Sequence, residues 1–423
     1  MTSSSLAERP SIVLWGPRNS GKSSLINRLS RQDVSIVSDQ AGTTTDLVRR
    51  ALELRQVGAV TLVDSAGIDE DPEDCLGQER VARTRQALQA ADCALLVLPA
   101  QDFQKGQDAP PPYWDQVLHY ARLIPANCPQ ILVLNQSEGL SPEEQTDSRQ
   151  RLARLLGPKL GQRPCLSVSA LANSGIEALL GLLRQALDQH RREEAPRLIT
   201  GGLVRAGDYV LLVMPQDRAA PKGRLIQAQS ATIQELLQLG AQVLIADVQQ
   251  IPQLRRELQT PIRLVICDSQ VFGPASSVCQ GLNLTSFSIL FAAYKGDIHY
   301  YCASLPSLAQ LQAGDRVLIA ESCSHEPTNE DIGRVKIPRL LRQRFGDQLQ
   351  IDIVGGRDFP EDLSPYRLII QCGGCMFTRQ HLLTRLEAAR QQAVPMVNYG
   401  ICLAWFQGIL DQLIIPEVRP ISD

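Results

Sequence analysis

The feature that most constrains this chain is a glycine-rich segment near its beginning, Gly16–Ser24 (GPRNSGKSS). It follows the apolar run SIVLW and precedes an amphipathic helical stretch, the context in which G-x-x-x-x-G-K-[ST] binds phosphate. Gly16 and Gly21 allow the backbone to curl so that its N–H groups face the phosphates. Lys22 offers an ammonium group to the β- and γ-phosphates, and the Ser23 hydroxyl can hold Mg²⁺. The predicted nucleotide-binding residues of this α/β domain are Gly16, Asn19, Ser20, Gly21, Lys22, Ser23 and Ser24.

Two further segments supply residues that a nucleoside triphosphatase needs. Asp64-Ser-Ala-Gly67 follows a second apolar strand, so Asp64 is placed to hold Mg²⁺, usually through water, and the Gly67 amide to contact a γ-phosphate. Gly42-Thr-Thr-Thr45 lies in the loop between, where a threonine can complete the magnesium shell, and we favour Thr44. The residues expected to act in hydrolysis are Lys22, Thr44, Asp64 and Gly67.

The nucleobase pocket is expected at the ends of two later strands. Asn135-Gln-Ser-Glu138 follows the strand QILVL, where guanine-reading proteins carry Asn-Lys-x-Asp. Ser169 and Ala170 follow a further short strand and complete the pocket. Glu138 has the right charge on a longer arm, and Gln136 replaces the lysine whose stem covers the base. GTP is therefore preferred over ATP, with reduced affinity and selectivity.

The whole chain is organised as three successive blocks that alternate apolar strands with helices. Its 423 residues exceed one ordinary core, since about 150 residues per domain is usual. Residues 1–190 form the nucleotide-binding block, 200–275 a small α/β block, and 282–423 a block with the strands RVLIAE, LQIDIV and RLIIQC. The predicted fold class is α/β, with three successive domains: first a P-loop fold, last a parallel-sheet domain with a metal site.

Charge and hydropathy exclude several classes of partner. The formal net charge is −3, so no global positive field attracts nucleic acid, and no nucleic-acid partner is expected. No run of about 18 apolar residues is present to cross a membrane. The first ten residues lack the apolar core of a secretory signal. The expected location is cytoplasmic, with mostly reduced cysteines.

The 11 cysteines are scattered and odd in number, which argues against a disulfide framework. In the last block, Cys323 and His325 follow the strand RVLIAE, and Cys372 and Cys375 follow RLIIQ. Since sites in open parallel sheets form at the carboxyl ends of strands, the fold can bring both pairs together. Three thiolates and a histidine suit structural zinc or an iron–sulfur cluster. A redox dithiol and ordinary buried cysteines remain alternatives, and spacing alone does not separate zinc from iron–sulfur.

With these motifs in this order, the nucleotide-binding block resembles the TrmE–Era branch of small GTPases over most of its length. Ile68 stands where Ras-like proteins keep a water-orienting glutamine, so another group must do that work. Asn19 resembles the residue that in this branch helps to bind K⁺, which offsets transition-state charge beside the phosphates. Asp74 is a candidate for positioning the attacking water, with an ordinary solvated acid as the alternative.

Several segments of the last two blocks match one family. They are Ala220–Leu225, Cys267–Phe272, Leu284–Phe291, Tyr294–Asp297, Glu321–His325, Asp331–Arg339 and Asn398–Gly400. Together they resemble the HydF family, the GTPases that help to mature FeFe-hydrogenases. The resemblance implies a 4Fe-4S cluster on Cys323, Cys372 and Cys375. The fourth iron would be open or weakly held, with His325 and Glu330 as candidate ligands.

The HydF resemblance implies a function that composition does not show. The chain would hold a diiron precursor near the cluster and pass it to apo FeFe-hydrogenase, with radical-SAM hydrogenase maturases as partners. GTP hydrolysis would act as a switch through loops that order on the γ-phosphate. The middle block would form a homodimer interface. The alternatives are a TrmE/Era-like ribosome- or RNA-associated GTPase with a structural zinc module, and a thiol oxidoreductase.

Overall fold

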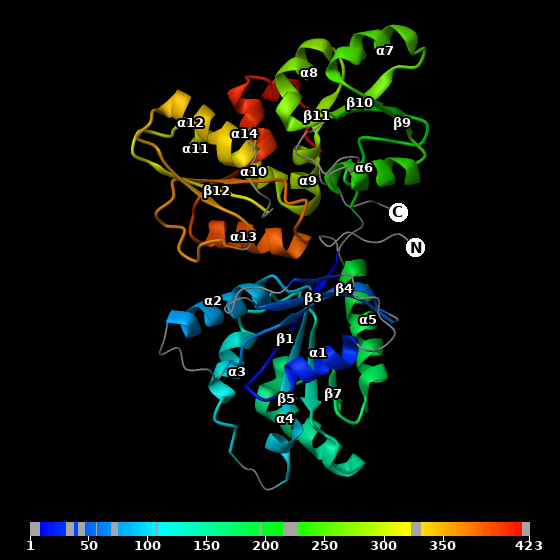
Figure 1. The fold of residues 1–423 in the computed structure, drawn as a ribbon, viewed down its shortest axis with the longest axis vertical. Helices are drawn as coiled ribbons and strands as arrows, with labels where there is room; N and C mark the ends of the chain where they lie inside the picture. The colour runs from blue at the N-terminus through cyan, green and yellow to red at the C-terminus, as the bar shows by residue number, and fades with distance from the viewer. Residues whose placement is uncertain are drawn as a thin grey trace. The chain divides into compact units, whose positions relative to one another are not determined.

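In the computed structural model the chain divides into two compact units, Met1–Ala195 and Pro196–Asp423. The first unit holds one seven-stranded sheet and the second holds two four-stranded sheets (Figure 1). The residues that the structure describes are 9–30, 38–40, 47–55, 57–68, 75–105, 109–193, 197–214, 227–322, 331–356 and 358–416. Within these residues, no helix is long and apolar enough to cross a membrane.

The sheet of the first unit has the order β2-β3-β4-β1-β5-β6-β7. Its strands are β1 (Ser11–Trp15), β2 (Ser38–Gln40), β3 (Val48–Leu54), β4 (Gly58–Asp64), β5 (Cys93–Pro99), β6 (Gln130–Asn135) and β7 (Cys165–Ser167). β4, β1, β5, β6 and β7 are parallel to one another. β3 pairs antiparallel with β4, and β2 pairs antiparallel with β3. The parallel part therefore brings the carboxyl ends of β1, β4, β5, β6 and β7 to one edge.

Helices cover both faces of this sheet because its central strands are apolar on both sides. They are α1 (Lys22–Ser30), α2 (Cys75–Gln89), η1 (Ala100–Phe103), α3 (Trp114–Ala121), α4 (Pro142–Leu160) and α5 (Ile176–Glu193). Along β1, Ile12 and Leu14 face a core shared with α1 and α5. Val13 and Trp15 face a second core shared with α2, α3 and α4. The continuous apolar run SIVLW is thus explained by burial on two faces.

The second unit contains two parallel sheets, in the orders β11-β10-β8-β9 and β13-β12-β14-β15. The strands of the first are β8 (Tyr209–Val213), β9 (Gln242–Ala246), β10 (Ile262–Cys267) and β11 (Leu284–Ser286). Those of the second are β12 (Arg316–Ala320), β13 (Gln350–Val354), β14 (Leu368–Gln371) and β15 (Met396–Asn398). All pairings in both sheets are parallel.

The helices of this unit pack between and around the two sheets. They are α6 (Gln227–Gln238), η2 (Val248–Gln250), α7 (Ile251–Glu257), η3 (Ser269–Val271), α8 (Phe272–Val278), α9 (Phe287–Lys295), α10 (Ile298–Ala303), α11 (Leu305–Ala309), the π-helical turn η4 (Ile332–Lys336), α12 (Ile337–Phe345), α13 (Arg379–Gln391), α14 (Tyr399–Phe406) and η5 (Leu410–Gln412).

Helix α9 joins the two sheets of the second unit (Figure 1). Its sequence FSILFAAYK is apolar almost all round, and the Ser286 hydroxyl caps it by accepting from the Ile289 amide at 3.2 Å. One face of α9 contributes to a core that runs through both sheets. The predicted α/β architecture, a P-loop domain followed by parallel sheets, is confirmed, and its last two sheets share one core.

Candidate nucleotide site and cysteine-bearing sheet edge

The predicted phosphate loop lies between β1 and α1, at the carboxyl end of β1. Gly16 has φ +146°, and a Cβ there would lie 2.1 Å from the Val97 carbonyl oxygen in β5. Gly21 has φ +85°, and a Cβ there would lie 2.3 Å from Asn135 Nδ2 in β6. Neither position has room for a side chain, so only glycines allow the loop to lie this close to the neighbouring strands.

Lys22, the first residue of α1, is buried, and its ammonium group folds back over the loop. Its Nζ donates to the carbonyl oxygens of Gly16 at 3.0 Å and of Pro17 at 2.8 Å. A phosphate in the loop would offer a charged acceptor, which makes a stronger hydrogen bond than a carbonyl does. The lysine is therefore held close to where phosphates are expected.

Ser23 and Asp64 form the pair of hard oxygen ligands that Mg²⁺ prefers. The Ser23 hydroxyl donates to Asp64 Oδ2 at 2.5 Å. Burial raises the pKa of the Asp64 carboxyl, opposed by this hydrogen bond and by the positive charges of Lys22 and Arg50. Asp64 Oδ1 is buried and has no hydrogen-bond partner within the described residues. A divalent cation would supply that partner, so the pair fits Mg²⁺.

Side-chain amides tie the phosphate loop to the predicted base pocket. Asn135 is 1% exposed; its Nδ2 donates to the Ser20 carbonyl at 2.9 Å, and its Oδ1 accepts from the Ala170 amide at 3.3 Å. The Gln136 side chain donates to the Asn19 carbonyl at 2.8 Å. The structure thus gives Asn135 and Gln136 a bracing role that the motif comparison did not predict.

The other predicted base-pocket residues lie around this brace. Ser169 and Ala170 are buried, and the Ser169 hydroxyl accepts from the Ala172 amide at 2.9 Å. Arg28 of α1 donates to the Ala170 carbonyl at 2.8 Å, which joins the loop after β7 to the helix after the phosphate loop. Glu138 is exposed, so its carboxylate is accessible to a base.

The segment after β4 touches the phosphate loop. The Ile68 amide, next to Gly67, donates to the Gly16 carbonyl at 3.2 Å, while the Ile68 side chain is buried and has no polar atom. Asn19 is exposed, with φ +60°. Thr44 and Asp74, predicted for magnesium and for water, lie outside the described residues.

A second sheet edge, in the second unit, carries the predicted cysteine site. Ala320 of β12 pairs with Gln371 of β14, and Gln371 pairs with Asn398 of β15. These three strands therefore end level with one another at their carboxyl ends. The residues that follow directly are Glu321, Cys372 and Tyr399. Parallel pairing thus places a thiol between a carboxylate and a phenol.

Of the predicted metal ligands, the structure describes Cys372 and Cys375, which share the turn after β14. Cys323, His325 and Glu330 lie outside the described residues. Among the residues that are described, no group of three or more His, Cys, Asp or Glu side chains is arranged to hold a metal ion. The described part therefore provides two of the three expected thiolates.

The Cys372 sulfur is already a hydrogen-bond acceptor. The Ser322 amide donates to it at 3.1 Å, and the Ser322 hydroxyl oxygen lies 2.9 Å from it. Burial raises the pKa of the Cys372 thiol, the Ser322 hydrogen bond opposes this rise, and the charge of Cys375 adds to it. Donors of this kind stabilise a metal-bound sulfur, and three cysteines are a recognised cluster ligand set. The Cys372–Cys375 turn therefore fits an iron–sulfur cluster.

A buried lysine fixes the turn that carries Cys375. Lys295, which is 4% exposed, donates to the carbonyl oxygens of Phe377 at 2.8 Å, Cys375 at 3.3 Å and Gly374 at 3.4 Å. Gly374 has φ +69°, and a Cβ there would lie 2.3 Å from Leu382 Cδ1. The sequence predicts no role for Lys295. Its signal is a charge that closes the otherwise apolar helix FSILFAAYK.

Tyr399 begins α14 on the other side of Cys372. Its side chain is 6% exposed, and its hydroxyl has no hydrogen-bond partner within the described residues. Burial raises the pKa of Tyr399 well above its usual value, and nearby negative charges, first that of Cys372, add to this. A Cβ on Gly333 would lie 2.1 Å from the Tyr399 hydroxyl and 2.3 Å from Glu321 Oε1. No residue larger than glycine fits between these two oxygens.

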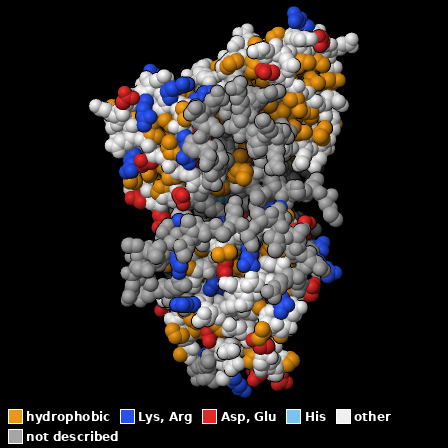
Figure 2. Space-filling model, in the orientation of Figure 1, with side chains coloured by type: hydrophobic (Ala, Val, Ile, Leu, Met, Phe, Trp, Pro, Cys, Tyr) orange, Lys and Arg blue, Asp and Glu red, His pale blue; other side chains and the backbone are white. Residues whose placement is uncertain are grey.

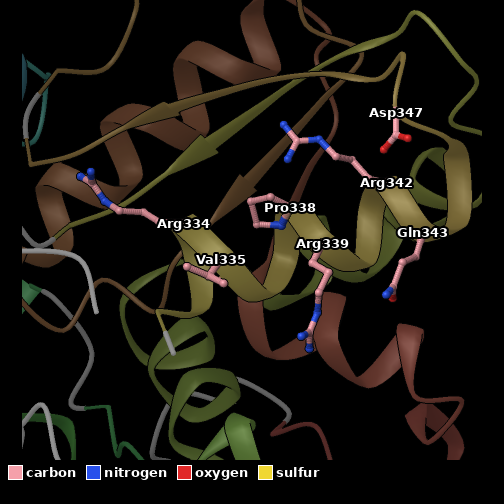
Figure 3. A pocket seen from close by; sticks show the side chains of 7 residues that line it. All are labelled: Arg334, Val335, Pro338, Arg339, Arg342, Gln343 and Asp347. Atoms are coloured by element: carbon pink, nitrogen blue, oxygen red, sulfur yellow. The ribbon is translucent and has the colours of Figure 1, made fainter. Parts of the chain in front are cut away.

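A shallow groove of about 520 Å³ runs along α12 and the turn before it. It is lined by Arg334, Val335, Pro338, Arg339, Arg342, Gln343 and Asp347 (Figure 3). Arg339 and Arg342 extend to opposite sides of the helix (Figure 3). Arg334 Nε donates to Glu321 Oε2 at 2.9 Å, so one arginine of the groove is hydrogen-bonded to a residue of the cysteine-bearing edge.

Fold and site together define a P-loop GTPase domain followed by parallel-sheet domains. A family model described as 50S ribosome-binding GTPase matches residues 11–136. Two further models, described as the hydrogen maturase F dimerization and tetramerization domains, match residues 199–296 and 299–416. The chain belongs to the HydF hydrogenase maturase family.

Other relatives match part of the chain. The mitochondrial 5-taurinomethyluridine-[tRNA] synthase subunit GTPB3 of Homo sapiens is 36% identical over 182 residues, 42% of this chain and 33% of that protein. The tRNA modification GTPase MnmE of a Synechococcus species is 35% identical over 206 residues, covering 49% of this chain and 42% of that protein. The chain thus spans less than half the length of these relatives.

Among solved structures, Era of Aquifex aeolicus bound to GDP and aluminium fluoride is similar at 19% identity and a TM-score of 0.33. The match covers 59% of this chain and 98% of Era.

Proposed function

We propose that this protein hydrolyses GTP and carries a 4Fe-4S cluster together with a diiron precursor, which it delivers to apo FeFe-hydrogenase. The observation that carries the proposal is the Cys372 sulfur, which accepts hydrogen bonds at the carboxyl edge of a parallel sheet. That sheet lies in a domain that hydrogenase maturases share, and open α/β sheets bind ligands at this edge.

In the proposed hydrolysis, the phosphate loop cradles the β- and γ-phosphates with backbone N–H groups. Lys22 leaves the carbonyls that it now contacts and binds the phosphate oxygens instead. Ser23 and Asp64, with Thr44, would hold Mg²⁺, which offsets the charge on the phosphates. The Gly67 amide contacts the γ-phosphate, and its movement after hydrolysis is the switch.

Asn19 and Ile68 together support a role for K⁺. The buried Ile68 side chain supplies no group that orients water or offsets charge. Asn19 is exposed in the phosphate loop, and its backbone carbonyl accepts from the Gln136 side chain. A K⁺ ion at Asn19 would supply the positive charge that other GTPases take from an arginine.

Cys372 and Cys375, together with Cys323, are the proposed cluster ligands. His325 or Glu330 would hold the fourth iron weakly, so that the position can exchange. An exchangeable iron is the chemistry that a carrier needs, because a bridging ligand can tether the diiron precursor there and later release it.

The proposed assembly uses the family's dimerization and tetramerization domains. β9 is an edge strand of the sheet β11-β10-β8-β9. Ile245 of β9 is 57% exposed, and Leu237 of the neighbouring helix α6 is 61% exposed. Hydrophobic side chains gather at the upper right of Figure 2, over the part of the second unit that contains β9. Pairing of β9 with a second copy would cover the open edge and these side chains. Radical-SAM maturases and apo-hydrogenase are the proposed partners of the assembled protein.

A transfer assay tests the function directly. Protein co-produced with the radical-SAM maturases is purified without oxygen and incubated with apo FeFe-hydrogenase, and hydrogen evolution is then measured. We expect activation that requires co-production with the maturases and is lost in Cys372→Ala. If the protein binds zinc instead of iron and retains RNA in a salt-sensitive way, the ribosome- or RNA-associated alternative replaces the proposal.

A further inference from the structure

Tyr399 is placed beside Cys372 by the register of the sheet. Gln371 and Asn398 are paired in adjacent parallel strands, and each is the last residue of its strand. The next residues, Cys372 and Tyr399, therefore leave the sheet as neighbours. Asn398 also fixes the start of α14, because its side chain accepts from the Gly400 amide at 2.7 Å. The position of Tyr399 relative to the thiol is thus set by backbone pairing.

The Tyr399 hydroxyl has no partner that the described residues provide, although it is buried. An unsatisfied buried hydroxyl is destabilising, so such a group usually has a partner in the working state of a protein. Because residue 333 is glycine, this hydroxyl can lie directly against the backbone there, where a Cβ would be only 2.1 Å away. The described residues therefore provide no acceptor for this hydroxyl, and the backbone of Tyr399 leaves the sheet next to that of Cys372.

At neutral pH a phenol is protonated and can donate one hydrogen bond. The carboxylate of Glu321 accepts from Arg334 Nε at 2.9 Å through Oε2, and its Oε1 faces Gly333 on the same side as the Tyr399 hydroxyl. The Cys372 sulfur already accepts from the Ser322 amide, and the Ser322 hydroxyl oxygen lies 2.9 Å from it. A cluster on Cys372 would add sulfide sulfurs, which are further hydrogen-bond acceptors.

We propose that the Tyr399 hydroxyl donates a hydrogen bond to a sulfur of the cluster, which rests on the cluster role proposed above. Hydrogen bonds to cluster sulfurs are among the factors that set reduction potential. Such a bond strengthens when the cluster gains an electron, so it favours the reduced form and raises the potential. Tyr399 is thus a positioning and tuning residue, while the thiolates hold the iron.

The test is an EPR-monitored redox titration of the reconstituted full chain, comparing wild type, Tyr399→Phe and Tyr366→Phe. Tyr366 is the matched control because its hydroxyl, in the same unit, donates to Asp352 at 2.9 Å and has no part in the proposal. We expect Tyr399→Phe to keep its iron content and melting temperature and to shift the midpoint potential to more negative values. The control should keep the wild-type potential.

Other outcomes identify what is wrong. If all three proteins bind the cluster and have equal midpoint potentials, the Tyr399 inference is overturned and the cluster proposal stays intact. Loss of iron from Tyr399→Phe alone means that the phenol is a ligand, and a lowered melting temperature means that it has a structural partner; either result overturns the donor assignment. Failure of wild type to take up iron overturns both proposals.

Discussion

The nucleotide site and the cysteine-bearing edge both lie at the carboxyl ends of parallel strands, but they are built differently. The phosphate loop is a continuous segment whose shape is imposed by Gly16 and Gly21. The cysteine-bearing edge collects the side chains that directly follow β12, β14 and β15, which are distant in the sequence. Backbone N–H donors survive most substitutions, whereas a site made of single side chains depends on each one. Function should therefore be lost by different kinds of mutation at the two sites.

The largest effect is expected at Lys22, the side chain that supplies positive charge to the backbone-built site. Lys22→Ala removes the ammonium group that binds the phosphates. We expect GTP turnover to fall by about 100-fold or more, the usual effect of losing a transition-state donor. Steady-state phosphate release measures this, with the exposed Lys105→Ala as control. Turnover close to wild type in Lys22→Ala would show that the phosphates bind elsewhere.

The next prediction is that two adjacent glycines in the turn between Cys372 and Cys375 differ in how much their replacement by alanine destabilises the protein. Gly374→Ala places a side chain at φ +69° and 2.3 Å from Leu382, whereas a Cβ on Gly373 meets nothing closer than 3.4 Å. We expect Gly374→Ala to destabilise the second unit by about 1–3 kcal/mol, the usual cost of such a backbone conformation, and Gly373→Ala to change little. Thermal melts of the full chain measure both. Equal effects would mean that the turn is not held as described.

These first two predictions show what the sequence can and cannot reveal. The phosphate loop is contiguous, so its residues were predictable from spacing, as were the apolar strands buried on two faces. Lys295 binds carbonyls in a turn 79 residues or more away, and Tyr399 meets Gly333 across the sheet edge. Such contacts depend on which faces pack together, and that information is not present in local periodicity. For the same reason, the core that the last two sheets share could not be predicted from the sequence.

A smaller effect concerns the pH dependence of stability at Asp64, whose buried Oδ1 has no hydrogen-bond partner among the described residues. Because burial raises its pKa, the folded protein binds this proton more tightly than the unfolded chain does. The stabilisation is present below the ordinary aspartate pKa of about 3.9 and is lost as pH rises through the raised value. In nucleotide-free protein without Mg²⁺, Asp64→Asn should therefore melt progressively higher than wild type as pH rises through this range.

Mg²⁺ and GTP should reverse that order, because the metal requires an ionised Asp64. Melting curves with and without both ligands measure the reversal, and the exposed Asp115→Asn serves as control. If Asp64→Asn gains as much stability from Mg²⁺ and GTP as wild type does, Asp64 is not part of the magnesium site.

The smallest effect is expected at the base pocket, where the arm of Glu138 is longer than the usual aspartate. Glu138→Asp should improve the preference for GDP over ADP by about tenfold at most, or roughly 1.4 kcal/mol. Competition binding measures the preference, with the exposed Glu143→Asp as control. A loss of preference would mean that the longer arm is matched to this pocket.

The account depends most on the cluster at the edge after β14. The decisive measurement is the iron and acid-labile sulfide content, with EPR after reduction, of protein reconstituted without oxygen. It compares wild type, Cys372→Ala and Cys302→Ala, a half-buried cysteine of the same unit that is not a proposed ligand. The account predicts about four irons per chain and a reduced-cluster signal in wild type and Cys302→Ala, and loss of both in Cys372→Ala. Stoichiometric zinc without iron uptake, or a cluster that persists in Cys372→Ala, would contradict it.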